Sequence, residues 1–163
     1  MSVALYRLAG IGLACALVTP ASAQLLARKD LSAAMALTIA QTAIATCKTN
    51  GYAVSATVVG RNGEVIVQIR GDGTGPHTVE NSFKKAFTSR TFRIPSGEME
   101  DRLKKNPQMG AQYLTGFTTG RGALPIMIGE EVIGAVGASG APGGEKDEAC
   151  IQTGLDKIKD RLN

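Results

Sequence analysis

Tryptophan is absent from the sequence, and phenylalanine and tyrosine together make up only 4% of its residues. A large aromatic core is therefore excluded, and the interior must be built from Val, Ile, Leu and Ala. Hydrophobic residues still account for 44% of the chain and charged residues for 20%, which is enough for a real core. The 163 residues contain no internal repeat or linker, so we expect a single domain over residues 24–163.

Common catalytic and metal-binding patterns are also missing. The chain has one histidine, His77, and no H-E-x-x-H, C-x-x-C, EF-hand or Ser-His-Asp arrangement, so we expect no structural zinc site. The Gly-rich stretch GASGAPGGEKDEAC (137–150) is no phosphate loop, because that motif needs Gly where Glu145 stands and Ser or Thr where Asp147 stands. The acidic residues here begin an expected helix and suit its dipole.

Basic residues form no long run. The formal net charge is +4, and the densest basic stretch holds Lys84, Lys85, Arg90 and Arg93. A nucleic-acid footprint needs a concentrated basic stripe, and no aromatic-interleaved basic strand occurs in this sequence. We therefore expect these residues to form a solvated face, and we expect no nucleic-acid partner.

The N-terminal apolar run is too short for a comfortable membrane span. It occupies residues 8–18, follows Arg7 and precedes an Ala-Ser-Ala triplet that ends at Ala23, which is the order found in secretory signals. We expect residues 1–23 to be a signal peptide and the protein to be periplasmic or secreted. Lipidation at Cys15 is the alternative, although its motif has Gly where Leu is preferred.

Cleavage there leaves two cysteines, Cys47 and Cys150. An exported protein with an even number of cysteines favours a disulfide. Both residues fall in expected helices, and their spacing fits no metal motif. We expect a disulfide between them, with a pair of buried free thiols as the alternative.

Hydrophobic periodicity predicts an alternation of helices and hairpins. Helices are expected at residues 31–49, 77–92, 99–105 and 145–162, and strands at residues 52–59, 64–70, 124–128 and 132–136. Asn62-Gly63 predicts a tight hairpin turn, and residues 109–117 predict a loop or a single helical turn. The fold class is therefore α/β (α+β), with a mainly antiparallel sheet flanked by helices.

Two long stretches carry a resemblance to a known family. They are GYAVSATVVGRNGEVIVQIRGDGTGPHTVENSFKKAFTSRTF (51–92) and GRGALPIMIGEEVIGAVGASGAPGGEKDEACIQTGLDKI (120–158). Together they closely resemble the GlcG/HbpS-like haem-binding (haem-degrading) family, which includes the C-terminal domain of PduO-type proteins. The resemblance implies a profilin-like fold, a homo-oligomer that is often an octamer, haem as cofactor and, for one member, partnership with a membrane sensor kinase.

The resemblance makes His77 the first candidate for a haem-iron ligand. His77 begins an expected helix after a Gly-rich loop, and neutral imidazole is a common axial ligand. Tyr113 is a further candidate for contact with haem, and Arg90 and Arg121 are candidates for binding its propionates. The alternative is a surface histidine that binds nothing.

Lys85 and Asp72 are the weak candidates for catalysis. A lysine within an apolar helical stretch can act as a base or form an imine. The structural alternative pairs Lys85 with Asp72 or Glu80, and Glu80 is also expected to pair with Lys84 four residues on.

We therefore hold two functional hypotheses. The first is an exported haem- or tetrapyrrole-binding protein that stores, senses or degrades haem. The second is an enzyme or accessory protein for a small organic acid or aldehyde, which requires Lys85, Asp72 and Arg121 to line one cleft. A structural partner of a membrane sensor is a third reading, and it predicts no pocket for a small ligand.

Overall fold

The computed structural model describes residues 25–162, and the expected signal peptide lies outside them. Among the described residues, no helix has the length and apolar character needed to cross a membrane. The elements are α1 (Ala33–Thr49), β1 (Ser55–Val59), β2 (Val65–Ile69), α2 (His77–Phe92), α3 (Ser96–Lys105), η1 (Gly110–Tyr113), β3 (Ala123–Ile128), β4 (Glu131–Ser139), α4 (Gly144–Ile158) and η2 (Lys159–Arg161). Each expected helix and strand is confirmed, with shifted ends.

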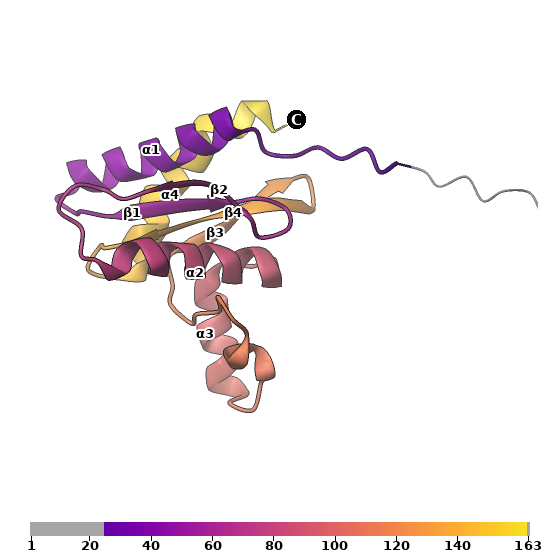
Figure 1. The fold of residues 1–163 in the computed structure, drawn as a ribbon. Helices are drawn as coiled ribbons and strands as arrows, with labels where there is room; N and C mark the ends of the chain where they lie inside the picture. Colours follow the sequence, from indigo (N-terminus) through magenta and orange to yellow (C-terminus); the bar gives the residue numbers. More distant parts are fainter. Residues whose placement is uncertain (1–24, 163) are drawn as a thin grey trace, which may run out of the picture.

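The four strands of the described chain form one sheet in the order β2-β1-β4-β3, and every pairing is antiparallel. Helices α1 and α4 pack side by side on one face, and α2 covers the other face (Figure 1). The expected α+β class with an antiparallel sheet between helices is confirmed. Strands β2 and β3 are the two edges, so the central pair β1 and β4 is covered on both faces.

The face under α1 and α4 holds the main apolar core. Ile39 of α1 and Ile151 of α4 are fully buried against Val58 and Val136 of the central strands. Burying an aliphatic side chain of this size contributes about 1.5–3 kcal/mol. Aliphatic residues supply this core, as the lack of tryptophan led us to expect.

The face under α2 carries buried hydroxyl groups, because Ser55 and Thr57 alternate with apolar residues along β1, and beside them a small apolar cluster of Val59, Ala86 and Ala135. Ser55 and Thr57 point to α2 and form hydroxyl pairs with Thr78 at 2.8 Å and Ser82 at 2.7 Å. The helix lies so close to β4 that a Cβ on Gly137 would stand 2.4 Å from the carbonyl oxygen of Ser82. This close, hydrogen-bonded contact fixes α2 over the sheet.

The ends of α1 and α2 differ in their capping residues. The Ser32 hydroxyl accepts a hydrogen bond from the Met35 N–H and caps α1, and Gly51 follows that helix with φ of +80°. Helix α2 instead ends at Arg93, which has φ of 60° and ψ of 33°. A left-handed conformation costs a residue with a side chain roughly 1–2 kcal/mol, and Gly usually takes this position.

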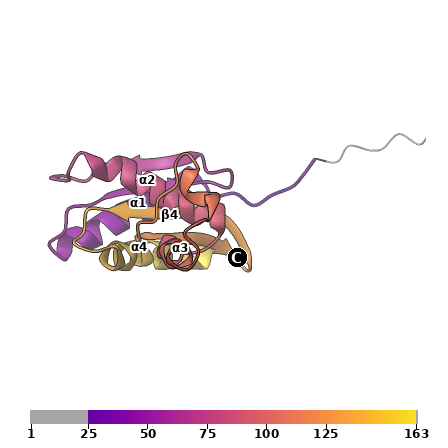
Figure 2. The ribbon, with the colours of Figure 1, turned by 90° about the horizontal axis from the view of Figure 1, so that it is seen from below.

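Helix α3 and η1 project from the body below α2, and α3 lies in front of the sheet when the molecule is seen from below (Figures 1 and 2). The projection is held to the body by Met99, which is fully buried, and by an edge-to-face contact between Phe92 and Phe117. Segment η1 confirms the single helical turn expected within residues 109–117.

A disulfide joins Cys47 near the end of α1 to Cys150 in α4, and their Cα atoms are 5.4 Å apart. The expected disulfide is confirmed. Both residues are buried in a small cluster with Val54, and Tyr52 and Ala141 pack against it. The bond therefore braces the two helices at one end of the sheet.

We expect the double substitution Cys47→Ala/Cys150→Ala to lower the free energy of unfolding by about 2–5 kcal/mol, because the bond closes a loop of 103 residues in the unfolded chain. Urea unfolding followed by circular dichroism measures the loss. Reductant should destabilise the native protein by a similar amount and leave the variant unchanged. Equal stability of the two oxidised proteins would contradict this prediction.

Candidate functional site

A buried ion pair lies between α2 and the start of α4. The Lys85 ammonium donates to the Asp147 carboxylate at 2.8 Å and to the Ala138 carbonyl oxygen at 3.0 Å. The side chains are only 6% and 2% exposed. The second carboxylate oxygen of Asp147 accepts the Ala141 N–H at 3.1 Å, so the pair ties α2 to the end of β4 and to the loop after it.

This pair corrects two expectations. Lys85 is not part of a solvated face, and its partner is neither Asp72 nor Glu80. Asp147 is not a solvent-facing acid that only suits the dipole of α4, because it is buried. The expected surface pair between Glu80 and Lys84 is confirmed at 2.6 Å.

Burial raises the pKa of the Asp147 carboxyl above its ordinary value of 3.8, although the Lys85 ammonium and the Ala141 N–H act in the opposite direction. Moving a carboxylate out of water is costly, and here the single ammonium and one backbone donor offset part of that cost. The Lys85–Asp147 pair is therefore an anchor whose two halves depend on each other.

Beside this pair lies a cleft of about 630 Å³, which we call the His77 cleft. Its lining comes from the loop before α2, the first turns of α2, the loop after α1 and the loop after β4. These lining residues include Tyr52, Gly73, Thr74, Gly75, His77, Asn81, Lys85, Ser139, Gly140, Pro142 and Asp147. Hydroxyl, amide, imidazole and ammonium groups thus converge on one end of the sheet.

His77 is the first residue of α2, and its side chain is exposed at this cleft. A Cβ on Gly75 would stand 2.9 Å from the imidazole Cε1 atom, so the absence of a side chain there gives the ring its place. Asn81 is held one turn further along, where its amide donates to the Ser139 hydroxyl at 3.0 Å. The imidazole is therefore available to a ligand while its polar neighbours are fixed.

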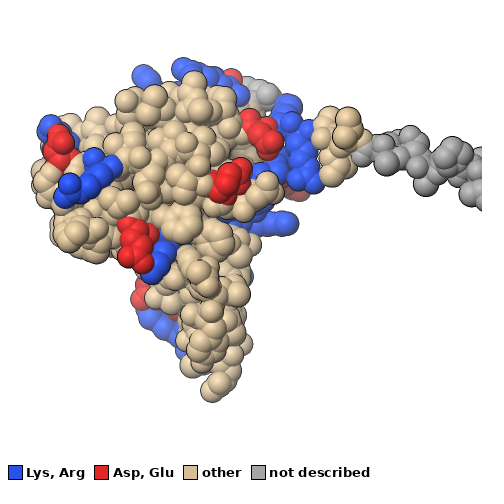
Figure 3. Space-filling view, viewed as in Figure 1, with Lys and Arg blue, Asp and Glu red and all other residues tan. Residues whose placement is uncertain are grey.

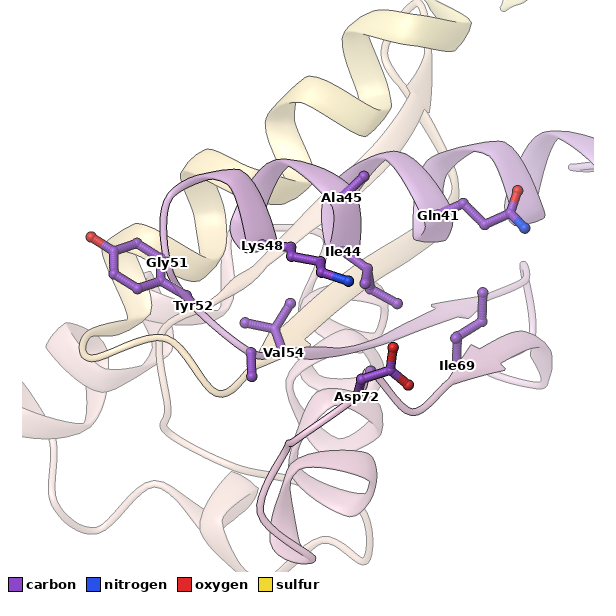
Figure 4. A pocket seen from close by; sticks show the side chains of 11 residues that line it. Gln41, Ile44, Ala45, Lys48, Gly51, Tyr52, Val54, Ile69 and Asp72 are labelled. Carbon is purple, nitrogen blue, oxygen red and sulfur yellow. The ribbon is translucent and has the colours of Figure 1, made fainter.

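A second cleft of about 620 Å³ adjoins the first, and Tyr52 lines both. This apolar cleft lies between α1 and the β1–β2 end of the sheet, with Ile44, Val54 and Ile69 in its lining (Figure 4). Lys48 enters it from α1 and Asp72 from the loop after β2 (Figure 4). Asp72 thus lies in a different cleft from Lys85.

The remaining candidates lie elsewhere. Arg121 pairs with Glu148 at 3.4 Å beside the start of α3, and Tyr113 is 82% exposed on the projecting η1. Arg90 lies thirteen residues after His77 on α2, which is about 20 Å along a helix. The structure therefore does not bring Tyr113, Arg90 or Arg121 to the His77 cleft of the same protomer.

Metal-binding groups are sparse in the described part of the chain. Residues 25–162 contain no cluster of three or more His, Cys, Asp or Glu side chains that could hold a metal ion. Any metal at the His77 cleft would thus need most of its ligands from elsewhere, as iron has in a porphyrin.

The comparisons with known proteins identify the family. Residues 31–156 match the family described as "Haem degrading protein HbpS-like". The chain belongs to the HbpS-like family. Over 103 residues this HbpS-like protein is 29% identical to an uncharacterised 15.0 kDa protein of Citrobacter freundii, covering 61% of this chain and 72% of that protein.

Solved structures agree with this assignment. A crystal structure of HbpS is 30% identical, covers 86% of this chain and 99% of its own, and has a TM-score of 0.79. The ORFY protein of Klebsiella pneumoniae is 25% identical to this chain. The match covers 83% of this chain and 95% of ORFY, with a TM-score of 0.76. A haem complex of PduOC is 21% identical, covers 78% and 94%, and shares the fold with a TM-score of 0.72.

Sequence reasoning missed Asp147 as a site residue. Its position among the acidic residues at the start of α4 gave a sufficient local explanation through the helix dipole. One signal was Lys85 itself, since a lysine within an apolar helical stretch requires a nearby carboxylate if it is buried. The polar face of α2 carried a second signal, since Thr78, Ser82 and Lys85 recur at helical spacing.

We expect Lys85→Met to lower the free energy of unfolding by about 3–5 kcal/mol, because it leaves the Asp147 carboxylate buried without its cation. The matched control is Lys84→Met at the neighbouring exposed pair with Glu80, for which about 0–1 kcal/mol is expected. Urea unfolding of both variants measures the difference. Equal effects at the two positions would show that the buried pair has no special role.

Proposed function

We propose that this protein binds haem in the His77 cleft, with the His77 imidazole as a ligand of the iron. The observation that carries the proposal is that the only histidine of the chain lies exposed at a cleft of about 630 Å³. The family description, "Haem degrading protein HbpS-like", supports the same ligand. The solved complex of PduOC with haem supports it through the fold alone, because PduOC is only 21% identical in sequence to this chain.

The His77 side chain is suited to act as a ligand of haem iron. Imidazole nitrogen is a usual axial donor, and the loop of Gly73 and Gly75 leaves the ring uncovered. The His77 cleft itself is polar, whereas a porphyrin needs apolar contacts on its faces. The adjoining cleft offers them through Ile44, Val54 and Ile69, and Lys48 there supplies a cation for a propionate.

The chain's own groups would hold the site in shape. The Lys85–Asp147 pair fixes α2, which carries His77, against the loop that forms the opposite wall. The disulfide beneath Tyr52 and Ala141 braces the same wall from the other side.

The enzyme or accessory hypothesis required Lys85, Asp72 and Arg121 to line one cleft. Lys85 lines the His77 cleft, Asp72 lines the apolar cleft, and Arg121 is engaged by Glu148. This geometry gives no support to activity on a small organic acid or aldehyde.

Export and self-association complete the proposal. The N-terminal signal pattern supports cleavage after Ala23, and the family resemblance supports a homo-oligomer, with an octamer as the expected form and a membrane sensor as its expected partner. Native mass spectrometry of protein isolated from the periplasm tests both points at once. We expect subunits that begin at Gln24 in an assembly of several copies, and an unprocessed monomer would contradict both.

We expect hemin to give a saturable Soret band with the purified protein, and we expect His77→Ala to abolish or shift that band because the iron loses its protein ligand. Tyr113→Phe is the matched control, since Tyr113 is exposed on η1 and should leave the spectrum unchanged. Absorption titration at micromolar hemin makes the measurement. No spectral change in the native protein, or an unchanged band in His77→Ala, would sink the proposed site.

A further inference from the structure

A group of arginines lies at the other end of α2 from His77. Arg61, Arg90 and Arg93 line a pocket of about 380 Å³ together with Glu130, Glu131 and Val132. On the face of the molecule seen in Figure 3, too, basic and acidic groups lie next to one another. Among the described residues, only one of these three guanidinium groups has a carboxylate partner.

Arg61 is fully engaged. It donates to Asp30 at 2.9 Å, to Glu131, and to the Lys29 carbonyl oxygen at 2.6 Å. Glu131 is thereby committed to Arg61. Glu130 is exposed and forms no ion pair with another described residue.

Arg90 has no such partner. None of its N–H groups meets an acceptor among residues 25–162, and its Nε atom is buried without a hydrogen bond. Burial, with the guanidinium groups of Arg93 and Arg61 nearby, lowers the pKa of Arg90. Buried donors in folded proteins are almost always satisfied, so this unpaired N–H needs an acceptor from outside the described chain.

Arg93 adds an independent observation. It occupies the left-handed position after α2, with φ of 60°, where a glycine would be unstrained. It too lacks an ion pair or hydrogen bond within the described residues, and it lines the same pocket as Arg90. Strain held at a residue whose side chain faces a pocket points toward binding.

We propose that Arg90 and Arg93 bind a small oxyanion, a phosphate or carboxylate group, in this pocket. The guanidinium fork matches two oxygens of either group, and the Nε–H of Arg90 is the donor that such an oxygen would satisfy. A metal cation does not fit, because among the described residues the pocket holds two unpaired guanidinium groups against one unpaired carboxylate, that of Glu130. The site is independent of haem, because α2 separates Arg90 from His77 by about 20 Å.

Calorimetric titration of the purified protein with inorganic phosphate, and separately with malonate, tests this site at constant ionic strength. We expect saturable binding of at least one ion to the native protein. In Arg90→Gln we expect the affinity to fall by about tenfold or more, because a charged hydrogen-bonding group is lost. Arg90→Lys keeps the charge without the fork and should recover only part of the affinity. Preference for phosphate or for malonate identifies the class of oxyanion.

Arg102→Gln is the matched control, because Arg102 is an exposed arginine of α3 that does not line the pocket. Equal loss in this control, or no saturable binding of either ion to the native protein, would overturn the proposal. An altered subunit number in Arg90→Gln with unchanged ion affinity would assign Arg90 to an interface between copies and also overturn it. Should Arg90→Gln fail to fold, Arg93→Gln and the native titration decide the outcome.

Discussion

The Lys85–Asp147 ion pair is the constraint around which one end of this molecule is organised. The two residues are 62 positions apart in the sequence and meet where α2, the end of β4 and the loop before α4 converge. The segment just before β3 leaves room for the pair because Gly122 has no side chain. A Cβ there would stand 2.6 Å from the Lys85 ammonium nitrogen. A buried charge pair tolerates little displacement, so the surrounding loops inherit a fixed geometry.

That geometry gives the two ends of α2 different chemistry. The first end carries His77 over a cleft whose walls are held by the ion pair and the disulfide. The other end carries Arg90 and Arg93, two cations that form no ion pair or hydrogen bond with another side chain of the described residues. A single helix, held against β4 by the close contact at Gly137, thus positions two unlike groups at a fixed separation.

The amino-acid pattern was sufficient for much of this fold. Alternation along residues 64–70 and the apolar stripe of α1 depend on local spacing, which the sequence displays directly. The disulfide followed from cysteine parity and an expected oxidising compartment. The candidate site was less accessible, because the partner of Lys85 is set by tertiary packing, and Asp147 already had a local explanation at a helix start.

The same limit applied to the arginines. Arg90 and Arg121 were suitable propionate partners by residue type, but type says nothing about distance from His77. The structure places Arg121 against Glu148 and Arg90 at the far end of α2. Hydrophobic periodicity assigns residues to faces of an element, whereas which charged side chains share a cleft depends on how several elements meet.

The disulfide also sets an order of events in the life of the chain. Cys47 and Cys150 are 103 positions apart and all four strands lie between them, so the bond cannot form until every strand of the sheet has been synthesised. The described chain has no other cysteine, so no wrong pairing within it competes. Within the folded domain the bond joins two helices that already pack side by side.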